Sequence, residues 1–137
     1  MRKPEATIIW EGPGKTGEGK MSTRSGVLNN ASYNFKSRFT GGEGTNPEEL
    51  IAAAHAGCFT MKLAFNLEEA GYTAEKLETT CSVTFIDGTI KASNLELNAT
   101  IPGIPEEEFK KLVFDAEKNC PVSKLMNADI KVQSKLN

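Results

Sequence analysis

The sequence has few of the features that mark a secreted, membrane-bound or nucleic-acid-binding protein. The N-terminal stretch MRKPEATIIW contains no apolar run of signal-peptide length, and no later segment is expected to be long and apolar enough to span a bilayer. Lys and Arg number 16 against 18 Asp and Glu. Because both signs are interspersed, bulk charge indicates neither a nucleic-acid nor a membrane partner. A cytoplasmic location is therefore expected.

The sequence is also poor in residues that bind metals or form disulfides. It has one histidine, His55, and three cysteines, which cannot all pair within one chain. His55 and Cys58 are three residues apart and would face one ion, but a zinc site needs about four ligands and no Cys-x-x-Cys pair is present. We expect no metal and no other cofactor. In a reducing compartment such thiols are structural, catalytic or metal-binding more often than disulfide-bonded.

What is present is typical of one globular α+β domain covering residues 1–137. Hydrophobic residues make up 39%, enough for a core in a chain of this length. Helices are expected at 47–70, 105–120 and 121–126, with Gly71 as a stop. Strands are expected at 6–12, 20–28, 31–39, 76–86, 89–101 and 128–136. Antiparallel hairpins segregated from the main helices, with an Asp87-Gly88 turn between two strands, favour α+β over a doubly wound parallel sheet.

Two glycine-rich segments are predicted to be loops. GPGKTGEGK, residues 12–20, superficially resembles a phosphate-binding loop but does not match the G-x-x-x-x-G-K-[ST] pattern, so a turn is the better interpretation. GGEGTN, residues 41–46, precedes the longest helical pattern.

The helix expected from Pro47 is apolar on almost every side. Leu50, Ile51, Ala54, Gly57, Cys58, Met61 and Phe65 share one side at 100° per residue, and Ala52, Ala56, Phe59, Leu63 and Leu67 cover another. Only His55, Lys62 and Asn66 form a polar stripe. A sheet covers one side of such a helix in a short chain, so a second subunit is expected on the other. The small residues Ala52, Ala53, Ala56 and Gly57 would allow close backbone approach. We therefore predict a homodimer.

Cys58 has two interpretations. Free cysteine is often simply buried, so it is either a small core residue or a reactive thiol in an apolar pocket. Because burial alone raises a thiol pKa, the second interpretation requires a nearby cation. The candidate cations are Arg24, Arg38 and Lys62.

The remaining candidate residues also have purely structural interpretations. Cys120 precedes Pro121, so it is either a helix N-cap, where the dipole favours a thiolate, or a plain turn residue. Cys81, in the middle of a strand, is expected to pack. His55 lies about 60° from Cys58 on the helix with no orienting Asn or Asp indicated, so a Cys–His hydrolase is disfavoured and a solvent-edge or interface position is expected.

The start of the central helix carries two acids. Asn46 is predicted to cap it, with Glu49 completing a capping box. Glu48 has no such explanation, and an arginine partner would supply one. On a straight helix Glu48 and Cys58 are about 15 Å apart. One arginine would therefore touch both only if the helix starts late or bends, or if the acid comes from another subunit.

Several of these stretches together resemble one family. GTNPEELIAAAHAGCF at 44–59, GVLNNASYNFKSRF at 26–39 and NCPVS at 119–123 are similar to motifs of the OsmC and Ohr (osmotically inducible protein C and organic hydroperoxide resistance) family. They occur in the family's order and at its separations, and the resemblance extends from about Trp10 to the last strand. The "SRF" and "AHAGC" segments place the chain on the OsmC side.

The resemblance implies an intertwined homodimer with antiparallel sheets and a long buried central helix, with two active sites at the subunit interface. It also implies a thiol peroxidase that prefers organic hydroperoxides to hydrogen peroxide. Cys58 would be the peroxidatic thiol and Cys120 the resolving one, forming a disulfide after each turnover. Arg38 would stabilise the Cys58 thiolate and Glu48 would hold Arg38, with Arg24 a less favoured substitute.

The implied partners are an organic hydroperoxide and an external thiol reductant, such as a lipoyl-type dithiol. The apolar neighbours Ile51, Ala54, Met61 and Phe65 suit an alkyl group on the substrate. The alternative is a non-enzymatic dimeric stress or small-molecule-binding protein of the same fold.

Overall fold

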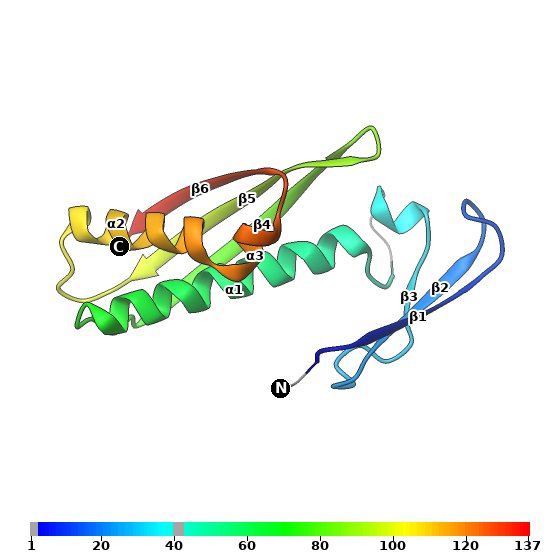
Figure 1. Ribbon diagram of the computed structural model, residues 1–137, viewed down its shortest axis with the longest axis horizontal. Coiled ribbons are helices and arrows are strands. Elements are labelled where there is room, and N and C mark those ends of the chain that lie inside the picture. Colours follow the sequence, from blue (N-terminus) through cyan, green and yellow to red (C-terminus); the bar gives the residue numbers. More distant parts are fainter. Residues whose placement is uncertain (1–2, 40–42) are drawn as a thin grey trace. The chain divides into compact units, whose positions relative to one another are not determined.

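The computed structural model describes residues 3–39 and 43–137, in two compact units. We call residues 1–50 the N-terminal unit and residues 51–137 the C-terminal unit. Their helices and strands follow the predicted chain order, with one added 3-10 helix (Figure 1). Residues 41 and 42 of the predicted 41–46 loop lie outside the described residues.

The N-terminal unit contains an antiparallel sheet of β1 (Ala6–Glu11), β2 (Glu18–Thr23) and β3 (Ala31–Tyr33), in that order. β2 and β3 end several residues earlier than predicted. The strand expected at 20–28 ends because the Thr23 N–H donates to the carbonyl of Leu28 at 2.9 Å, which closes a turn. The strand expected at 31–39 gives way to the 3-10 helix η1 (Lys36–Arg38), whose Ser37 N–H is capped by the Asn34 side chain at 3.0 Å. Local side-chain caps compete with strand pairing in this way.

The long helix α1 (Pro47–Glu69) begins and ends where the sequence predicts. Asn46 Oδ1 accepts from the Glu49 N–H at 2.8 Å, and Gly71 adopts a φ of +91° just beyond the end. The second half of the predicted capping box is absent, because the Glu49 carboxylate accepts from the Thr45 hydroxyl at 2.7 Å. The helix therefore has a side-chain N-cap and a left-handed C-terminal stop.

One face of α1 is buried and the opposite face is exposed within the chain. Phe59, Leu63 and Leu67 are at most 1% exposed, whereas Met61 and Phe65 are 64% and 59% exposed. The expectation that no segment is long enough to cross a membrane was wrong, because α1 has the necessary length and composition. A helix that packs one apolar face in a core and leaves an apolar face outside has the same composition as a membrane-spanning helix.

The C-terminal unit contains a second three-stranded sheet, ordered β4 (Lys76–Ile86), β5 (Thr89–Thr100) and β6 (Asp129–Leu136). β4 and β5 form the predicted hairpin, and Asp87 and Gly88 have φ angles of 51° and 73°, as a tight type I′ turn requires. β6 pairs parallel to β5, so the sheet is mixed rather than antiparallel as expected. The crossover through α2 (Glu106–Asn119) and α3 (Pro121–Leu125) carries the chain back to the starting end of β5, which makes the pairing parallel.

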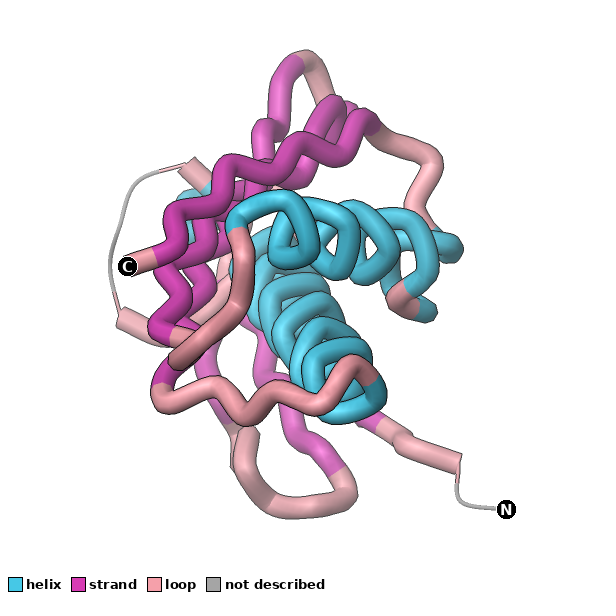
Figure 2. Tube along the Cα trace, turned by 90° about the vertical axis from the view of Figure 1, so that its left-hand side faces the viewer, coloured by secondary structure: helices cyan, strands magenta, loops and turns pink. Residues whose placement is uncertain are grey.

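Helices α1 and α2 cover one face of this sheet (Figure 2). Alternate β5 residues point into the core, and Ser93, Leu95, Leu97 and Ala99 are at most 2% exposed. Leu95, Leu97 and Ala99 pack in one cluster with Phe59 and Leu63 of α1 and with Phe109 of α2. The result is the predicted α+β architecture, and its core places α1, β5 and the start of α3 against one another.

Candidate functional site

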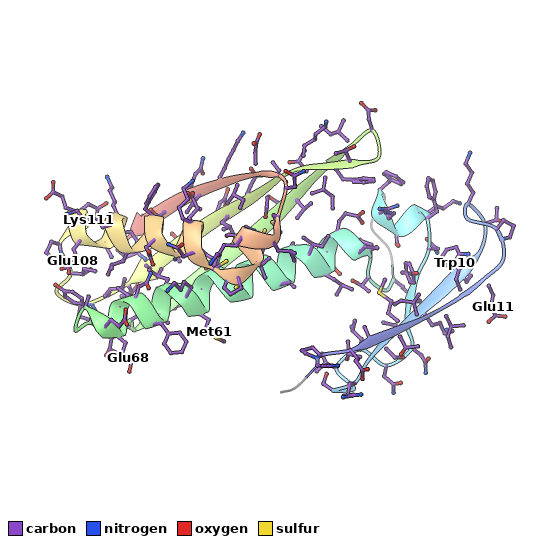
Figure 3. All side chains as sticks on the ribbon, viewed as in Figure 1. Trp10, Glu11, Met61, Glu68, Glu108 and Lys111 are labelled. Carbon is purple, nitrogen blue, oxygen red and sulfur yellow. The ribbon has the colours of Figure 1, made fainter. Side chains whose placement is uncertain are left out.

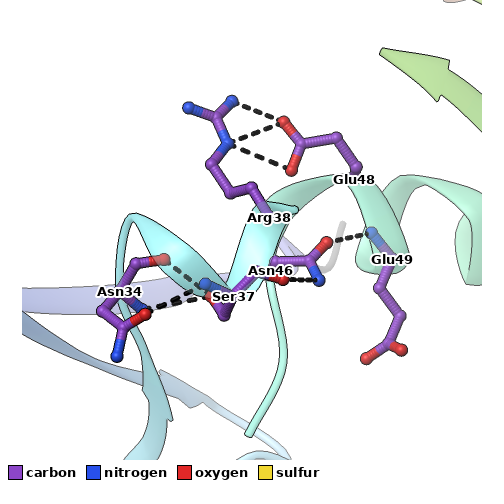
Figure 4. A network of polar contacts seen from close by, with 6 residues as sticks. All are labelled: Asn34, Ser37, Arg38, Asn46, Glu48 and Glu49. Atoms are coloured by element: carbon purple, nitrogen blue, oxygen red, sulfur yellow. Dashed lines mark hydrogen bonds and ion pairs between the residues drawn. The ribbon is translucent and has the colours of Figure 1, made fainter. Parts of the chain in front are cut away.

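An ion pair joins Arg38 to Glu48 within the N-terminal unit (Figure 4). The Nε atom of Arg38 donates to both carboxylate oxygens of Glu48, at 3.0 and 3.2 Å, and a terminal nitrogen of the guanidinium donates to Oε1 as well. The Glu48 side chain is 10% exposed and that of Arg38 is 32% exposed. Glu48 therefore has the arginine partner that the sequence suggested, from the same chain.

The ion pair depends on the local fold around η1 (Figure 4). Ser37 donates its N–H and its hydroxyl to Asn34, and the Asn34 N–H donates to the Ser37 hydroxyl, which fixes the 3-10 turn that carries Arg38. Asn46, besides capping α1, donates its side-chain N–H to the carbonyl of Ser37 at 2.7 Å. The cap residue thus ties η1 to the first turn of α1, where Glu48 lies.

The ion pair shifts the pKa of both partners. Burial raises the pKa of Glu48, but hydrogen bonds from Arg38 and the backbone, together with the charge of Arg38, outweigh it and leave that pKa below its usual value. The hydrogen bond to Glu48 raises the pKa of Arg38. Both groups are therefore charged at neutral pH, and Glu48 holds the guanidinium in a defined orientation.

The thiols of Cys58 and Cys120 lie side by side in the C-terminal unit. Cys58 is half-buried on α1, Cys120 is 0% exposed at the start of α3, and both are free. Burial raises the pKa of Cys58; a hydrogen bond with the backbone of Val122 lowers it, and the neighbouring Cys120 thiol raises it again. None of these causes is a cation, so the protonated thiol is favoured in the C-terminal unit taken by itself.

Cys120 is a helix N-cap, which was one of the two interpretations of its sequence position. Its Sγ accepts from the Ser123 N–H at 3.3 Å, and Pro121 occupies the first helical position. The thiol also donates to the hydroxyl of Ser123 at 3.1 Å. These bonds hold the sulfur at the end of α3 that packs on α1.

The prediction of a solvent-edge or interface position for His55 was wrong. The side chain is 0% exposed, with Nδ1 at 2.6 Å from the Ser93 hydroxyl and Nε2 at 2.8 Å from the Ser123 hydroxyl. Asn66 of the same predicted polar stripe is also buried, and it donates to Asp115 of α2 at 2.9 Å. Buried polar groups are tolerated here because each finds a partner across the core, which a helical wheel does not reveal.

The other candidate cations have carboxylate partners. Arg24 forms an exposed ion pair with Glu5 in the N-terminal unit. Lys62 approaches Asp115 in the C-terminal unit, with Nζ at 3.9 Å from the carboxylate. Arg38 is the candidate whose carboxylate partner is buried, so its charged group is the most firmly oriented of the three.

The residues predicted to contact substrate share one side of α1 with Cys58. Ala54, Met61 and Phe65 are exposed within the chain and Ile51 is partly exposed. In Figure 3 Met61 points away from the sheet of its own unit. Their role in substrate binding stays a prediction.

Sequence reasoning missed Ser93 and Ser123, and it found only part of the role of Cys81. Ser123 could have been found from its position, because the third residue after a helix N-cap such as Cys120 donates its N–H to the cap side chain. Ser93 gave no signal, since its bonds to His55 and Cys81 depend on tertiary pairing. Cys81 packs against the core as predicted, and its Sγ lies 3.2 Å from the Ser93 hydroxyl.

Comparison with known proteins gives consistent results. Residues 40–135 match the family described as OsmC-like protein. The chain is 43% identical over 131 residues to peroxiredoxin OsmC of Escherichia coli K12, covering 93% of this chain and 92% of that protein. It is 33% identical over 95 residues to an organic hydroperoxide resistance protein of Xanthomonas axonopodis, covering 67% and 66% of the two chains.

Solved structures show the same fold. The organic hydroperoxide resistance protein OhrB of Bacillus subtilis aligns with a TM-score of 0.65 at 26% identity, over 97% of this chain and 98% of that one. An OsmC-like protein from Mycoplasma pneumoniae aligns with a TM-score of 0.77 at 14% identity, over 98% and 97%. The second likeness concerns the fold alone.

Proposed function

The chain belongs to the OsmC-like family, and from this premise we propose that it is a thiol-dependent peroxidase that reduces organic hydroperoxides to alcohols. The observation that carries the proposal is the pair of free thiols in the C-terminal unit. Cys58 is half-buried and reachable, and the fully buried thiol of Cys120 lies beside it. Relatives named peroxiredoxin OsmC and organic hydroperoxide resistance protein support this activity.

The proposed cycle has three balanced steps. The Cys58 thiolate attacks the distal oxygen of the hydroperoxide and breaks the O–O bond; with one proton the alcohol leaves, and Cys58 becomes a sulfenic acid. Cys120 attacks this sulfur to form a disulfide, and the sulfenic oxygen leaves as water. An external dithiol, such as a lipoyl group, restores both thiols by exchange and is itself oxidised to a disulfide.

The first step needs a positive charge, and we propose that Arg38 supplies it to the Cys58 thiolate. The environment of the C-terminal unit raises the pKa of Cys58, so without a cation the reactive form would be scarce. Arg38 is permanently charged, and Glu48 fixes the direction of its guanidinium. Glu48 acts through Arg38 and is therefore a positioning residue.

We also propose that residues 1–137 act as one OsmC-like domain in a cytoplasmic homodimer. The exposed apolar side of α1 supports the homodimer, because Met61 and Phe65 remain open within one chain. Together with Ile51 and Ala54 they would contact the alkyl group of the substrate. Hydrogen peroxide has no alkyl group to bury, so it is expected to be the poorer substrate.

The decisive experiment compares wild type with Cys58→Ser. Loss of cumene hydroperoxide is followed in the presence of dithiothreitol, and wild type alone is expected to turn over. In Cys120→Ser, one equivalent of peroxide is expected to yield a Cys58 sulfenic acid that dimedone traps and mass spectrometry assigns.

A non-enzymatic binding or stress protein of the same fold is the alternative, and the raised pKa of Cys58 is the observation that favours it. Equal peroxide loss for wild type and Cys58→Ser, at the rate of dithiothreitol alone, would establish that alternative.

A further inference from the structure

A row of hydrogen bonds crosses the core of the C-terminal unit from one thiol to another. It runs from Cys81 on β4 to Ser93 on β5, then to His55 on α1, Ser123 on α3 and Cys120. The successive donor–acceptor distances are 3.2, 2.6, 2.8 and 3.1 Å. His55, Ser93 and Cys120 are 0% exposed, and Ser123 is 7% exposed. The row is therefore shielded from water over most of its length.

The hydrogen bonds have one consistent direction around Ser123. The Cys120 thiol donates to the Ser123 hydroxyl oxygen, which leaves the hydroxyl hydrogen for Nε2 of His55. The imidazole then carries its own hydrogen on Nδ1 and donates it to Ser93, whose hydroxyl can donate to Cys81. This tautomer is assigned from the network. Burial lowers the pKa of His55, which agrees with a neutral ring whose Nε2 accepts.

The second step of the proposed cycle, in which Cys120 attacks the Cys58 sulfenic acid, requires the Cys120 thiol to lose its proton. The inference rests on that cycle. We propose that His55, acting through Ser123, receives the proton of Cys120 while Cys120 attacks the sulfenic acid at Cys58. The thiol proton moves to the Ser123 oxygen as the hydroxyl hydrogen moves to Nε2 of His55. The Sγ–Sγ bond forms and the S–O bond of the sulfenic acid breaks.

The proton count closes with water as the second product. The sulfenic oxygen leaves as hydroxide, and the proton held by His55 returns through the Ser123 hydroxyl to neutralise it. One disulfide and one water therefore form from one sulfenic acid and one thiol. A buried thiol has no water to take its proton, so a hydrogen-bonded acceptor fits the task. His55 is a positioning residue in this scheme, because it reaches Cys120 only through Ser123.

The surroundings of His55 contain few competing titratable groups. The row presents the thiols of Cys81 and Cys120 to the ring through the two hydroxyls, and Cys58 is three residues along the same helix. Among the described residues, burial is the one cause that shifts the pKa of His55. Proton transfer to this ring therefore depends on the row itself rather than on a nearby carboxylate.

The experiment measures disulfide formation in one turnover of the full chain. Reduced protein is mixed with one equivalent of cumene hydroperoxide between pH 5 and 9, and mass spectrometry follows the dimedone-reactive sulfenic acid and the Cys58–Cys120 disulfide. In His55→Gln the amide still forms hydrogen bonds but takes up no proton. We expect sulfenic acid formation within about twofold of wild type, and disulfide formation at least about tenfold slower at neutral pH. The deficit should shrink at acidic pH, where a protonated His55 in the wild type no longer accepts the thiol proton.

Ser93 and Ser123 provide matched variants, because each hydroxyl bonds one nitrogen of the same ring. Ser123→Ala is expected to slow disulfide formation as His55→Gln does, while Ser93→Ala slows it less than about threefold. Ser123→Thr keeps the hydroxyl and should restore the rate. If His55→Gln does not fold, the comparison of Ser123→Ala with Ser123→Thr provides the test.

Two results would overturn the inference. One is disulfide formation at the wild-type rate in His55→Gln or, if that variant does not fold, in Ser123→Ala. The other is a deficit that is equal at every pH and equal for Ser93→Ala and Ser123→Ala, which would indicate a purely structural network. Failure of the proposed function looks different, because wild type itself would then consume no peroxide.

Discussion

At the scale of single residues, the Arg38–Glu48 ion pair contributes stability that depends on pH. The folded-state pKa of Glu48 lies below its unfolded value, so the contribution is complete above the unfolded pKa and is lost as pH falls through the folded one. We expect Glu48→Gln to lower the free energy of unfolding by about 1 kcal/mol at pH 7, a modest figure because Arg38 is partly exposed. Urea denaturation at pH 7 and at pH 3 measures the difference, which should shrink at the lower pH.

Glu49→Gln is the matched control for this prediction. Glu49 neighbours Glu48 in the first turn of α1, but its carboxylate accepts from Thr45 rather than from an arginine. Its substitution should change stability by less than that of Glu48. A Glu48→Gln deficit that is the same at both pH values would show that the ion pair is not its source.

A second residue-scale prediction concerns the charge at Cys58. In a Cys120→Ser background, Arg38→Gln is expected to raise the pKa of Cys58 by about one unit and slow iodoacetamide alkylation at pH 7 about tenfold. Arg24→Gln is the control, since Arg24 pairs with Glu5 in the N-terminal unit. Alkylation rates between pH 5 and 10 give the pKa directly. An unchanged profile for Arg38→Gln would remove Arg38 from its proposed role.

At the scale of elements, the β4–β5 hairpin depends on backbone conformations that few residues adopt. Gly88 has a φ of 73°, and a Cβ added there would meet nothing within 4 Å. Backbone strain is therefore the main cost of Gly88→Ala, which is expected to lower the free energy of unfolding by about 1 kcal/mol. Gly88→Asn should cost less, because Asn tolerates this region. Chemical denaturation of both variants tests the order, and equal losses would contradict it.

The sequence pattern of α1 predicts the bounds of the helix but not the environment of each side chain on it. Its bounds follow from Asn46, Pro47 and Gly71, which are local signals. The placement of His55 does not follow from pattern, because the ring is buried only through hydroxyls that β5 and α3 bring to it. Polar residues on one side of a helix therefore either face solvent or form hydrogen bonds inside the core, and only the tertiary contacts show which.

At the scale of the whole molecule, the exposed apolar side of α1 predicts self-association. Phe65→Asp is expected to shift the protein from dimer to monomer in analytical ultracentrifugation, since a charge on a buried apolar interface is costly. Phe114→Asp is the control, because Phe114 is equally exposed but lies on α2. A monomeric wild type, or a dimer that survives Phe65→Asp unchanged, would contradict the prediction.

The sequence alone determined the element order, the bounds of α1 and the β4–β5 turn. Each rests on caps, glycines and short-range periodicity, which act over a few residues. The family motifs in residues 26–59 and 119–123 then directed attention to Cys58 and Cys120. These are the features that local chemistry and the recognised motifs together predict.

Only the tertiary structure decided the rest. It placed β6 parallel to β5, because the packing of α2 and α3 sets the direction in which the crossover returns the chain. It buried His55 between Ser93 and Ser123, residues 38 and 68 positions away along the chain. Contacts at such separations depend on how the helices pack on the sheet. Burying a polar side chain is costly unless packing also brings its hydrogen-bond partners within reach.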